Sequence, residues 1–559
     1  MGDEGTYWQQ RFGRRSLFRG TAIALAGLSG AALVGCGDSD EAQTPGATAT
    51  NGGGVATSTL TADAGGRKRG GELRFAWTVP TPGIWVSRGG FNVSFHMATS
   101  DALAYVSADG TTKFDWSLME AAEYIDDVTL HGKLRQSVTY HDGTPFTAET
   151  ARRSIEFLRD AEATPQFGYR ALIETLDTIE TPSDTEIVFH LKQPDVGFLS
   201  NLGVQPGCSF SVDQIEKIGE EEARTKMAGT GPYRVESFVD ENSLTMAANP
   251  DYWLKDAHPY LDKLIMSGPL EGETKAAALE AGDVDAVWFT GAEPAVARLL
   301  ESKDLWNSRW EAGPDTLMLN HAMAPLDNLH VRKALALAID KTKHVEVLHA
   351  GLASPGKSLI PSVLKGYSDY EPYQYNVEAA KQALVDSGLE LPLRVTYALG
   401  SPPTQRASQT AALYQQQLNE VGFDVQIENV PDVQDAVILN RTHHMAGFPV
   451  AVRPNAVSTF QLYATSVGGF NPGRDSADPA QAEMERMVFE AAAEYEDEAR
   501  AAKLEEIHKI FVDNVFCQIP VVSKFRFAFG RQNVIGWDDP EFSNTPGGAS
   551  SRPGLLSLA

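Results

Sequence analysis

Residues 351–358 read G-L-A-S-P-G-K-S, which is the spacing of a loop that cradles nucleotide phosphates. Such a loop needs a strand leading into it and a helix that begins at the Lys-Ser pair. Here residues 331–348 have the apolar periodicity of a helix with Gly351 as its stop, and Pro361 follows too closely for a second helix. We therefore interpret both glycines as turn residues and predict no nucleotide site.

The sequence contains one histidine pair, His443-His444, but no H-E-x-x-H, C-x-x-C or G-x-S-x-G motif. Neighbouring residues on a strand point to opposite faces, so we expect one of these histidines to be buried and the other exposed. The alternative is a single histidine, His444, that faces a ligand cleft. No pattern indicates catalysis, a metal site or a cofactor.

The composition is that of a globular protein large enough for two or three domains. Of 559 residues, 42% are hydrophobic and 22% charged, and the net charge is −27. An acidic surface repels nucleic acid and anionic lipid headgroups, which excludes both as broad-surface partners.

The first 35 residues are typical of a signal peptide. A basic cluster precedes the apolar stretch Thr21–Gly35, which is shorter than the roughly 20 residues that a membrane-spanning helix needs. Arg14-Arg15 resembles a twin-arginine export signal, and residues 33–36 resemble a bacterial lipobox in which Cys36 is lipidated. An ordinary cleaved signal with a chance cysteine is the alternative. Residues 36–70 are then a lipidated cysteine and a disordered tether, because they carry almost no large apolar side chains.

From residue 71 the chain alternates predicted strands and helices. A strand is expected at 71–77, a helix capped by Thr147, and a hairpin over 229–253. Residues 376–430 predict helix, strand, helix and strand in turn, so a parallel sheet follows and the fold class is α/β. Cys208 and Cys517 lie in apolar surroundings typical of buried free thiols; a disulfide between them stays open.

Five ordered blocks resemble the family 5 extracytoplasmic solute-binding proteins of ABC importers, of the dipeptide, oligopeptide and nickel-chelate type. The blocks are residues 134–160, residues 229–253, residues 326–361, AALYQQQLNEVGFDVQI and CQIPVV. The resemblance implies a two-lobe, periplasmic-binding-protein-like (type II) α/β fold with an extra subdomain in lobe one. Lobe one would be 71–312 with a subdomain at about 107–222, lobe two 313–517, and 518–559 a return to lobe one and a C-terminal tail. The chain would cross between lobes near Gly313-Pro314 and near Ile519-Pro520.

The resemblance also implies a function without chemistry. A monomer tethered to the cell membrane would close its lobes on a peptide or peptide-sized solute and deliver it to the importer's permease. A nickel-chelate receptor using His443 or His444, a secreted hydrolase and a sensor that presents ligand to a receptor kinase are the rivals.

One segment departs from the family pattern. Peptide-binding members carry an Asp that holds the peptide's amino group, whereas this chain reads "HHMAGFPVAVRPNAVSTF", with Phe448 near the family's aromatic and Arg453 nearby. A guanidinium suits a carboxylate and not an ammonium group, so we expect a ligand other than an amine-anchored peptide. An exposed, uninvolved Arg453 is the alternative. The remaining candidate cleft residues are Trp85, Arg88 and Asn320.

Overall fold

The computed structural model describes residues 67–76, 98–106, 112–160, 164, 168–239, 242–268, 270, 272–289, 291, 293–362, 364–450, 453, 455–536 and 556–558. The signal peptide, Cys36, Trp85 and Arg88 lie outside these residues. In the described part of the chain, no helix has the length and apolar character that crossing a membrane requires.

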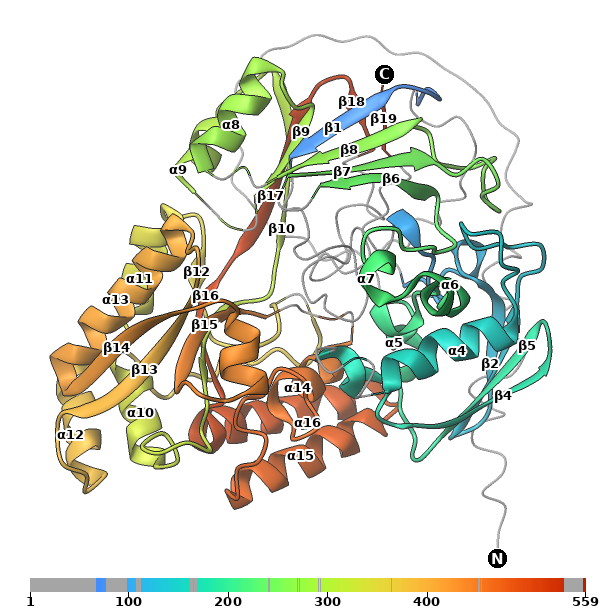
Figure 1. Cartoon of the computed structure of the whole chain (residues 1–559). Helices are drawn as coiled ribbons and strands as arrows, with labels where there is room; N and C mark the ends of the chain where they lie inside the picture. Colours follow the sequence, from blue (N-terminus) through green and yellow to red (C-terminus); the bar gives the residue numbers. More distant parts are fainter. Residues whose placement is uncertain are drawn as a thin grey trace, which may run out of the picture. The chain divides into compact units, whose positions relative to one another are not determined.

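Lobe one contains a seven-stranded sheet (Figure 1). In spatial order its strands are β10 (Leu305–Glu311), β17 (Phe525–Arg531), β9 (Ala286–Phe289), β1 (Glu72–Ala76), β8 (Lys263–Ser267), β7 (Ser243–Ala248) and β6 (Tyr233–Val239). Strand β1 runs parallel to β8 and β9, and β6 and β7 form the predicted antiparallel hairpin. Helices α8 (Gly272–Ala281) and α9 (Pro294–Leu300) pack against each other beside β9.

A separate four-stranded antiparallel sheet lies within the same half of the chain. Its spatial order is β2 (Met119–Asp126), β3 (Thr129–Leu134), β5 (Glu186–Leu191) and β4 (Leu176–Ser183). The apolar face of α4 (Ala148–Arg159) packs on β4 and β5. The other helical segments are η2 (Phe114–Trp116), η3 (Gly168–Ile173), α5 (Phe198–Asn201), η4 (Gln205–Gly207), α6 (Val212–Ile218) and α7 (Glu220–Ala223). We call both sheets, with these segments and α8 and α9, lobe one.

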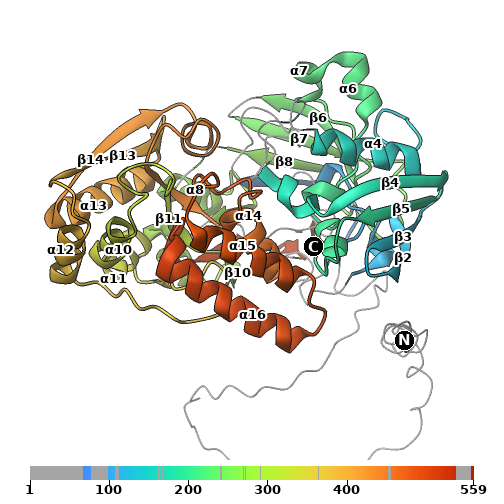
Figure 2. The ribbon, with the colours of Figure 1, turned by 90° about the horizontal axis from the view of Figure 1, so that it is seen from below.

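Lobe two is built on a six-stranded sheet. Its spatial order is β12 (Ser354–Pro355), β16 (Gln518–Ser523), β11 (Asp315–Leu319), β15 (Met445–Pro449), β13 (Leu393–Gly400) and β14 (Phe423–Val430). The helices are α10 (Leu329–Ala338), α11 (Lys341–His349), α12 (Val377–Asp386), α13 (Gln405–Val421), α14 (Ala456–Ala464), α15 (Pro479–Ala492) and α16 (Asp497–Ile510). Figure 2 shows α15 and α16 side by side. Two π-helical segments, η5 (Gln434–Leu439) and η6 (Phe511–Val515), and the ribbon β18 (Val534–Ile535) with β19 (Ser557–Leu558) complete the described elements.

The predicted helix and strand alternation of residues 376–430 is confirmed. The Asn376 and Thr404 side chains accept hydrogen bonds from Ala379 N and Ala407 N and so cap α12 and α13. Strands β13 and β14 then pair in parallel along their whole length, and their buried residues join the core beneath α10, α12 and α13. The fold is therefore α/β, as the sequence predicts.

The structure places no helix where a phosphate loop would need one. Helix α11 ends at His349, Ala350 adopts a left-handed conformation, and Lys357 and Ser358 lie outside any helix. The helical stretch before it is two helices, because Asp340 caps α11 and separates it from α10.

The chain passes between the seven-stranded and six-stranded sheets twice, at adjacent places. Residues 312–314 join β10 to β11, and Lys524 joins β16 to β17. The two passages are bonded to each other, because Ala312 N donates to Lys524 O at 2.8 Å.

The second passage differs from the expected one near Ile519-Pro520. Pro520 lies inside β16, which pairs with β11 in the lobe-two sheet. A proline usually interrupts a strand because it lacks an N–H, but it is tolerated at a bulge. The β11–β16 register shifts beside Asp315 and Thr316, and Thr316 is the residue opposite Pro520. The strand therefore continues past the proline.

Candidate functional site

An aromatic cluster lies where lobe one meets lobe two. Tyr169 in η3 of lobe one packs edge-on against Phe470 of lobe two, with ring centroids 5.5 Å apart. Phe470 also contacts Phe448 of β15 at 5.7 Å and stacks on Tyr463 of α14 at 5.1 Å. All four rings are buried. One ring comes from lobe one and three from lobe two, so the cluster spans the interface between lobes.

Arg453 extends this cluster with a buried positive charge. Its Cζ lies 4.3 Å from the centre of the Tyr169 ring, a cation–π contact, and only 1% of the residue is exposed. Nη1 donates to Gln205 Oε1 at 3.3 Å, and the backbone N–H faces Thr459 Oγ1 at 3.4 Å. Arg453 is therefore not an exposed bystander: it reaches from lobe two to Tyr169 and Gln205 of lobe one.

A second group of charges surrounds Asp315 at the first residue of β11. Lys524 donates to Asp315 Oδ1, and His349 Nε2 lies 4.0 Å from Oδ2. Burial alone would raise the pKa of Asp315, but the attraction of Lys524, His349 and Arg406 outweighs it, and the pKa lies below its usual range. Asp315 therefore stays ionised and is already paired with Lys524.

Arg526 in β17 interacts electrostatically with both groups, with Asp315 on one side and with Arg453 and Tyr169 on the other. It is partly buried, and removal from water lowers the pKa of its guanidinium to about 10 against the attraction of Asp315. Arg453 acts on it as a like charge. Lys524 and Arg526 thus both interact with one carboxylate, Asp315, and Arg453 lies near Arg526. The local charge is positive although the whole chain carries −27.

The structure brings Phe448 and Arg453 together but places Asn320 and His444 elsewhere. In the β11–β15 pair, Phe448 lies opposite Thr316, near the passage between lobes. Asn320 comes directly after β11 and His444 directly before β15, so both lie at the other end of the pair. There the Asn320 N–H donates to His444 O at 2.8 Å. Four residues of strand, about 13 Å, separate the two ends.

Both ring nitrogens of His444 are bonded to the protein. Nδ1 accepts from the Thr396 N–H at 3.0 Å, so Nε2 carries the proton and donates to Ala324 O at 3.0 Å. Burial lowers the pKa of His444, which keeps the ring neutral. The neighbouring His443 lies 3.2 Å from Glu428 Oε2.

The expectation that one histidine of the pair is buried and the other exposed is wrong, because both are buried. They precede β15 instead of lying on it, so strand alternation does not separate them. Among the described residues, no cluster of three His, Cys, Asp or Glu side chains is arranged to hold a metal ion. Cys208 and Cys517 are both buried, and no disulfide joins them.

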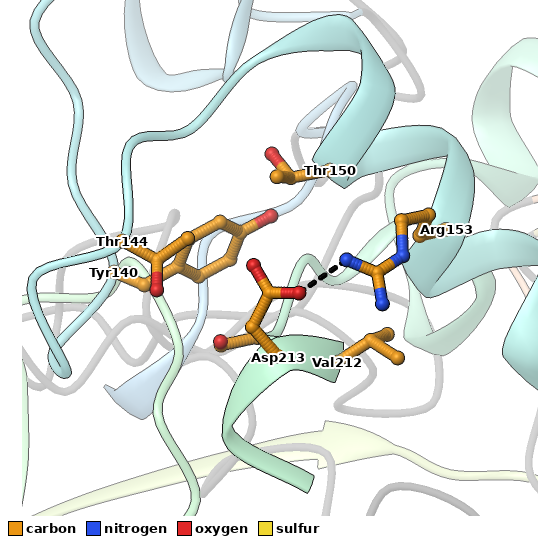
Figure 3. Close-up of a pocket in the computed structure, with 7 residues that line it drawn as sticks. Tyr140, Thr144, Thr150, Arg153, Val212 and Asp213 are labelled. Atoms are coloured by element: carbon orange, nitrogen blue, oxygen red, sulfur yellow. Dashed lines mark hydrogen bonds and ion pairs between the residues drawn. The ribbon is translucent and has the colours of Figure 1, made fainter. Parts of the chain in front are cut away.

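A small pocket in lobe one is a structural feature and not a binding site (Figure 3). It lies between the first turns of α4 and α6 and is too narrow to admit even a water-sized group. Its polar groups are already paired: Tyr140 OH bonds Ser209 Oγ at 2.6 Å, and Asp213 pairs with Arg153.

Further contacts join the two lobes around the aromatic cluster. Ser458 Oγ of α14 donates to Asn201 Oδ1 of lobe one at 3.0 Å, and the Val196 N–H donates to Ala492 O at 2.8 Å. On another side, Arg406 Nη2 of α13 lies 3.2 Å from Glu293 Oε1, beside α9. The lobes are therefore closed on each other, with the passages through Ala312 and Lys524 as their covalent connections.

Residues 117–471 match the family described as bacterial extracellular solute-binding proteins, family 5. The chain belongs to this family. The match covers the four-stranded sheet with α4 and most of lobe two. It includes Tyr169 of lobe one and Arg453 and Phe470 of lobe two.

The curated relatives that match this chain are distant in sequence. A glutathione-binding protein of Pectobacterium atrosepticum is 27% identical over 54% of this chain and 58% of its own length. A di/tripeptide-binding protein of Pseudomonas aeruginosa is 24% identical over 72% of this chain and 80% of its own length. The chain thus spans less than two thirds of the first of these relatives.

Solved structures show the family 5 fold. A periplasmic binding protein of Agrobacterium in complex with agropinic acid superimposes with a TM-score of 0.77 at 20% identity, covering 88% of this chain and 99% of that one. An ABC transporter-associated periplasmic binding protein of Helicobacter pylori in complex with the peptide STSA gives a TM-score of 0.77 at 20% identity, covering 88% of this chain and 98% of that one. The predicted type II two-lobe α/β fold is confirmed.

Sequence reasoning missed several residues that contact or surround Arg453. Tyr169 and Gln205 lie in short 3₁₀ segments without any periodic pattern, so nothing local pointed to them. The sequence could have indicated Arg526, because Lys524 and Arg526 alternate with phenylalanines in residues 523–530. Two cations on one face of an otherwise apolar strand indicate a charged partner on that face.

Proposed function

We propose that this protein is the substrate-binding subunit of an ABC importer, which captures a peptide-sized solute between its lobes and hands it unchanged to the permease. Family membership supports the class of function. The observation that carries the site is the Arg453 contact with Tyr169, because a buried cation–aromatic pair built from both lobes exists only when the lobes are closed.

Closure by hinging follows from the two connections between the lobes. A solute that contacts both lobes adds interactions only in the closed state and shifts the equilibrium toward it. The permease would distinguish loaded from empty protein by this change. The proposed ligand contacts are Phe448 and Arg453. Trp85, Arg88, Asn320 and His444 remain sequence predictions.

The experiment is native mass spectrometry of the protein purified from its own host, followed by small-angle scattering with and without the solute recovered. We expect one small solute to co-purify, to be released with its mass unchanged, and to reduce the radius of gyration when added back. A solute that is converted on incubation would instead indicate an enzyme and contradict the proposal.

Membrane tethering through Cys36 is the second part of the proposal. The basic cluster, the short apolar stretch and the cysteine in residues 1–36 support export and lipidation. We expect the mature protein to partition into detergent with a diacylglycerol mass on Cys36, and Cys36→Ser to be released into the medium or periplasm. Equal partitioning of both proteins would contradict an anchor at this residue.

A further inference from the structure

Arg453 carries buried hydrogen-bond donors that the protein leaves unused. Its Nε and Nη2 atoms are buried and have no hydrogen-bond partner, while Nη1 donates to Gln205 Oε1. A guanidinium donates but never accepts, so the amide oxygen of Gln205 must be the atom that faces it. Gln205 Nε2 is thereby left as a third buried donor without a partner.

The unpaired atoms of these two residues are all donors, and Arg453 has no carboxylate partner among the described residues. A buried donor without a partner is costly, and an unpaired buried charge more so. Asp315, a carboxylate that acts on nearby Arg526, is paired with Lys524. The group that complements Arg453 and Gln205 is therefore an anion rich in acceptors.

The Tyr169 ring sets the direction from which such an anion can bind. The guanidinium carbon lies over this ring, 4.3 Å from its centroid, so the ring blocks that side of Arg453. Nη1 is held by Gln205, so Nε and Nη2 remain as the adjacent pair of donors on one edge. This edge presents two parallel N–H bonds, which is the geometry that a planar carboxylate accepts with both oxygens.

We infer that Arg453 binds a carboxylate of the solute, so that this protein selects acidic solutes over neutral or amine-anchored ones. This inference rests on the proposed function and specifies its ligand class. Gln205 lies within reach of the same anion, and Arg526 adds a second positive charge to the surroundings. The preference for an anion arises at this interface in a chain whose overall charge of −27 would otherwise repel one.

The test uses the whole protein and a pool of carboxylic acids, each paired with its own carboxamide. The pool contains di- to pentapeptides, N-acetylated amino acids and sugar acids. Native mass spectrometry identifies retained members, and calorimetry measures the affinity for each retained acid and its amide. We expect only acids to be retained, with the matched amide bound at least tenfold more weakly, because it cannot supply charge-assisted bonds.

Variants of Arg453 separate recognition from lobe closure. Arg453→Gln is expected to abolish the preference for acid over amide, and Arg453→Lys to keep only part of it, because lysine has charge without the fork. Arg486→Gln, at an exposed site on α15, is the matched control and should keep the full preference. A variant that weakens acid and amide equally would assign Arg453 to closure alone and overturn the inference.

The two proposals fail in different ways. If an amide binds as tightly as its acid, or if the solute that co-purifies from the host gains no mass on methyl esterification, the carboxylate assignment is wrong and solute binding stands. If no solute co-purifies and no pool member binds, the proposed function itself fails, and this inference with it.

Discussion

Arg332 shows how one buried side chain can hold several elements together. It is 1% exposed, and its guanidinium donates to two backbone carbonyls before α10, to the Asp478 carboxylate and to Asn514 O. Asp478 also caps α15. A single cation thus joins α10, α15 and η6.

Replacing Arg332 with Met is expected to lower the free energy of unfolding by about 3 kcal/mol or more, because Asp478 and the carbonyls lose their buried donor. Urea unfolding followed by tryptophan fluorescence measures this change. The exposed Arg486→Met should stay within about 0.5 kcal/mol of the parent. Equal midpoints for the two variants would contradict the role given to Arg332.

Asp195 is a buried carboxyl group beside the contacts between lobes. Oδ2 accepts from Thr175 Oγ1 at 2.8 Å and Oδ1 from the Gly197 N–H at 2.9 Å. Burial nevertheless raises its pKa from the usual 3.8 to about 6. Between these two pH values the folded chain holds the proton more tightly than the unfolded chain does.

The contribution of Asp195 to stability is therefore present at acidic pH and is lost as the pH rises through 6. We expect Asp195→Asn to gain stability relative to the parent between pH 4 and 7, by an amount on the order of 2–3 kcal/mol. Thermal unfolding of both proteins across this range measures the difference. The exposed Asp177→Asn is the control. Difference curves that stay flat for both variants would refute the prediction.

At the scale of elements, helix α4 begins with a reciprocal cap. Thr147 Oγ1 accepts from Thr150 N at 3.3 Å, and Thr150 Oγ1 accepts from Thr147 N at 2.8 Å. The cap fixes where α4 starts above β4 and β5.

Thr147→Ala is expected to cost about 1 kcal/mol of unfolding free energy, whereas Thr147→Ser should cost less than about 0.5 kcal/mol because it keeps the acceptor. Chemical denaturation of the three proteins measures both values. If serine destabilises as much as alanine, the methyl group and not the cap is responsible.

The same cap shows which features a sequence can predict. Thr147, Asn376 and Thr404 act on backbone groups three residues away, so local pattern was sufficient for their helices and for the β13–α13–β14 unit. The end of β16 was not predictable, because Pro520 is tolerated by a bulge that depends on the partner strand. The site was half predictable: Phe448 and Arg453 lie in the segment that departs from the family pattern, whereas Tyr169 and Gln205 reach it through tertiary structure alone.

At the scale of the whole molecule, Arg406 and Glu293 form an ion pair across the lobes. Their atoms lie 3.2 Å apart, and both side chains are largely shielded from solvent. The pair exists only while α13 of lobe two lies beside the start of α9 of lobe one. It therefore favours the closed state directly.

We expect Glu293→Gln to weaken solute binding about two- to fivefold, which corresponds to the loss of roughly 0.5–1 kcal/mol from a partly shielded pair. Scattering of the ligand-free protein should show a larger radius of gyration. The exchange Glu293→Arg with Arg406→Glu restores the attraction and should recover part of the affinity. An exchanged protein no better than Glu293→Gln would indicate that the pair does not control closure.

The hydrogen bond from Ala312 N to Lys524 O has a further consequence. Because this bond joins the two connections between the lobes, we expect both connections to move together in the proposed opening and closing. Such a movement has essentially one degree of freedom. A single pair of spectroscopic labels, one on each lobe, would therefore report the entire opening and closing cycle as one changing distance.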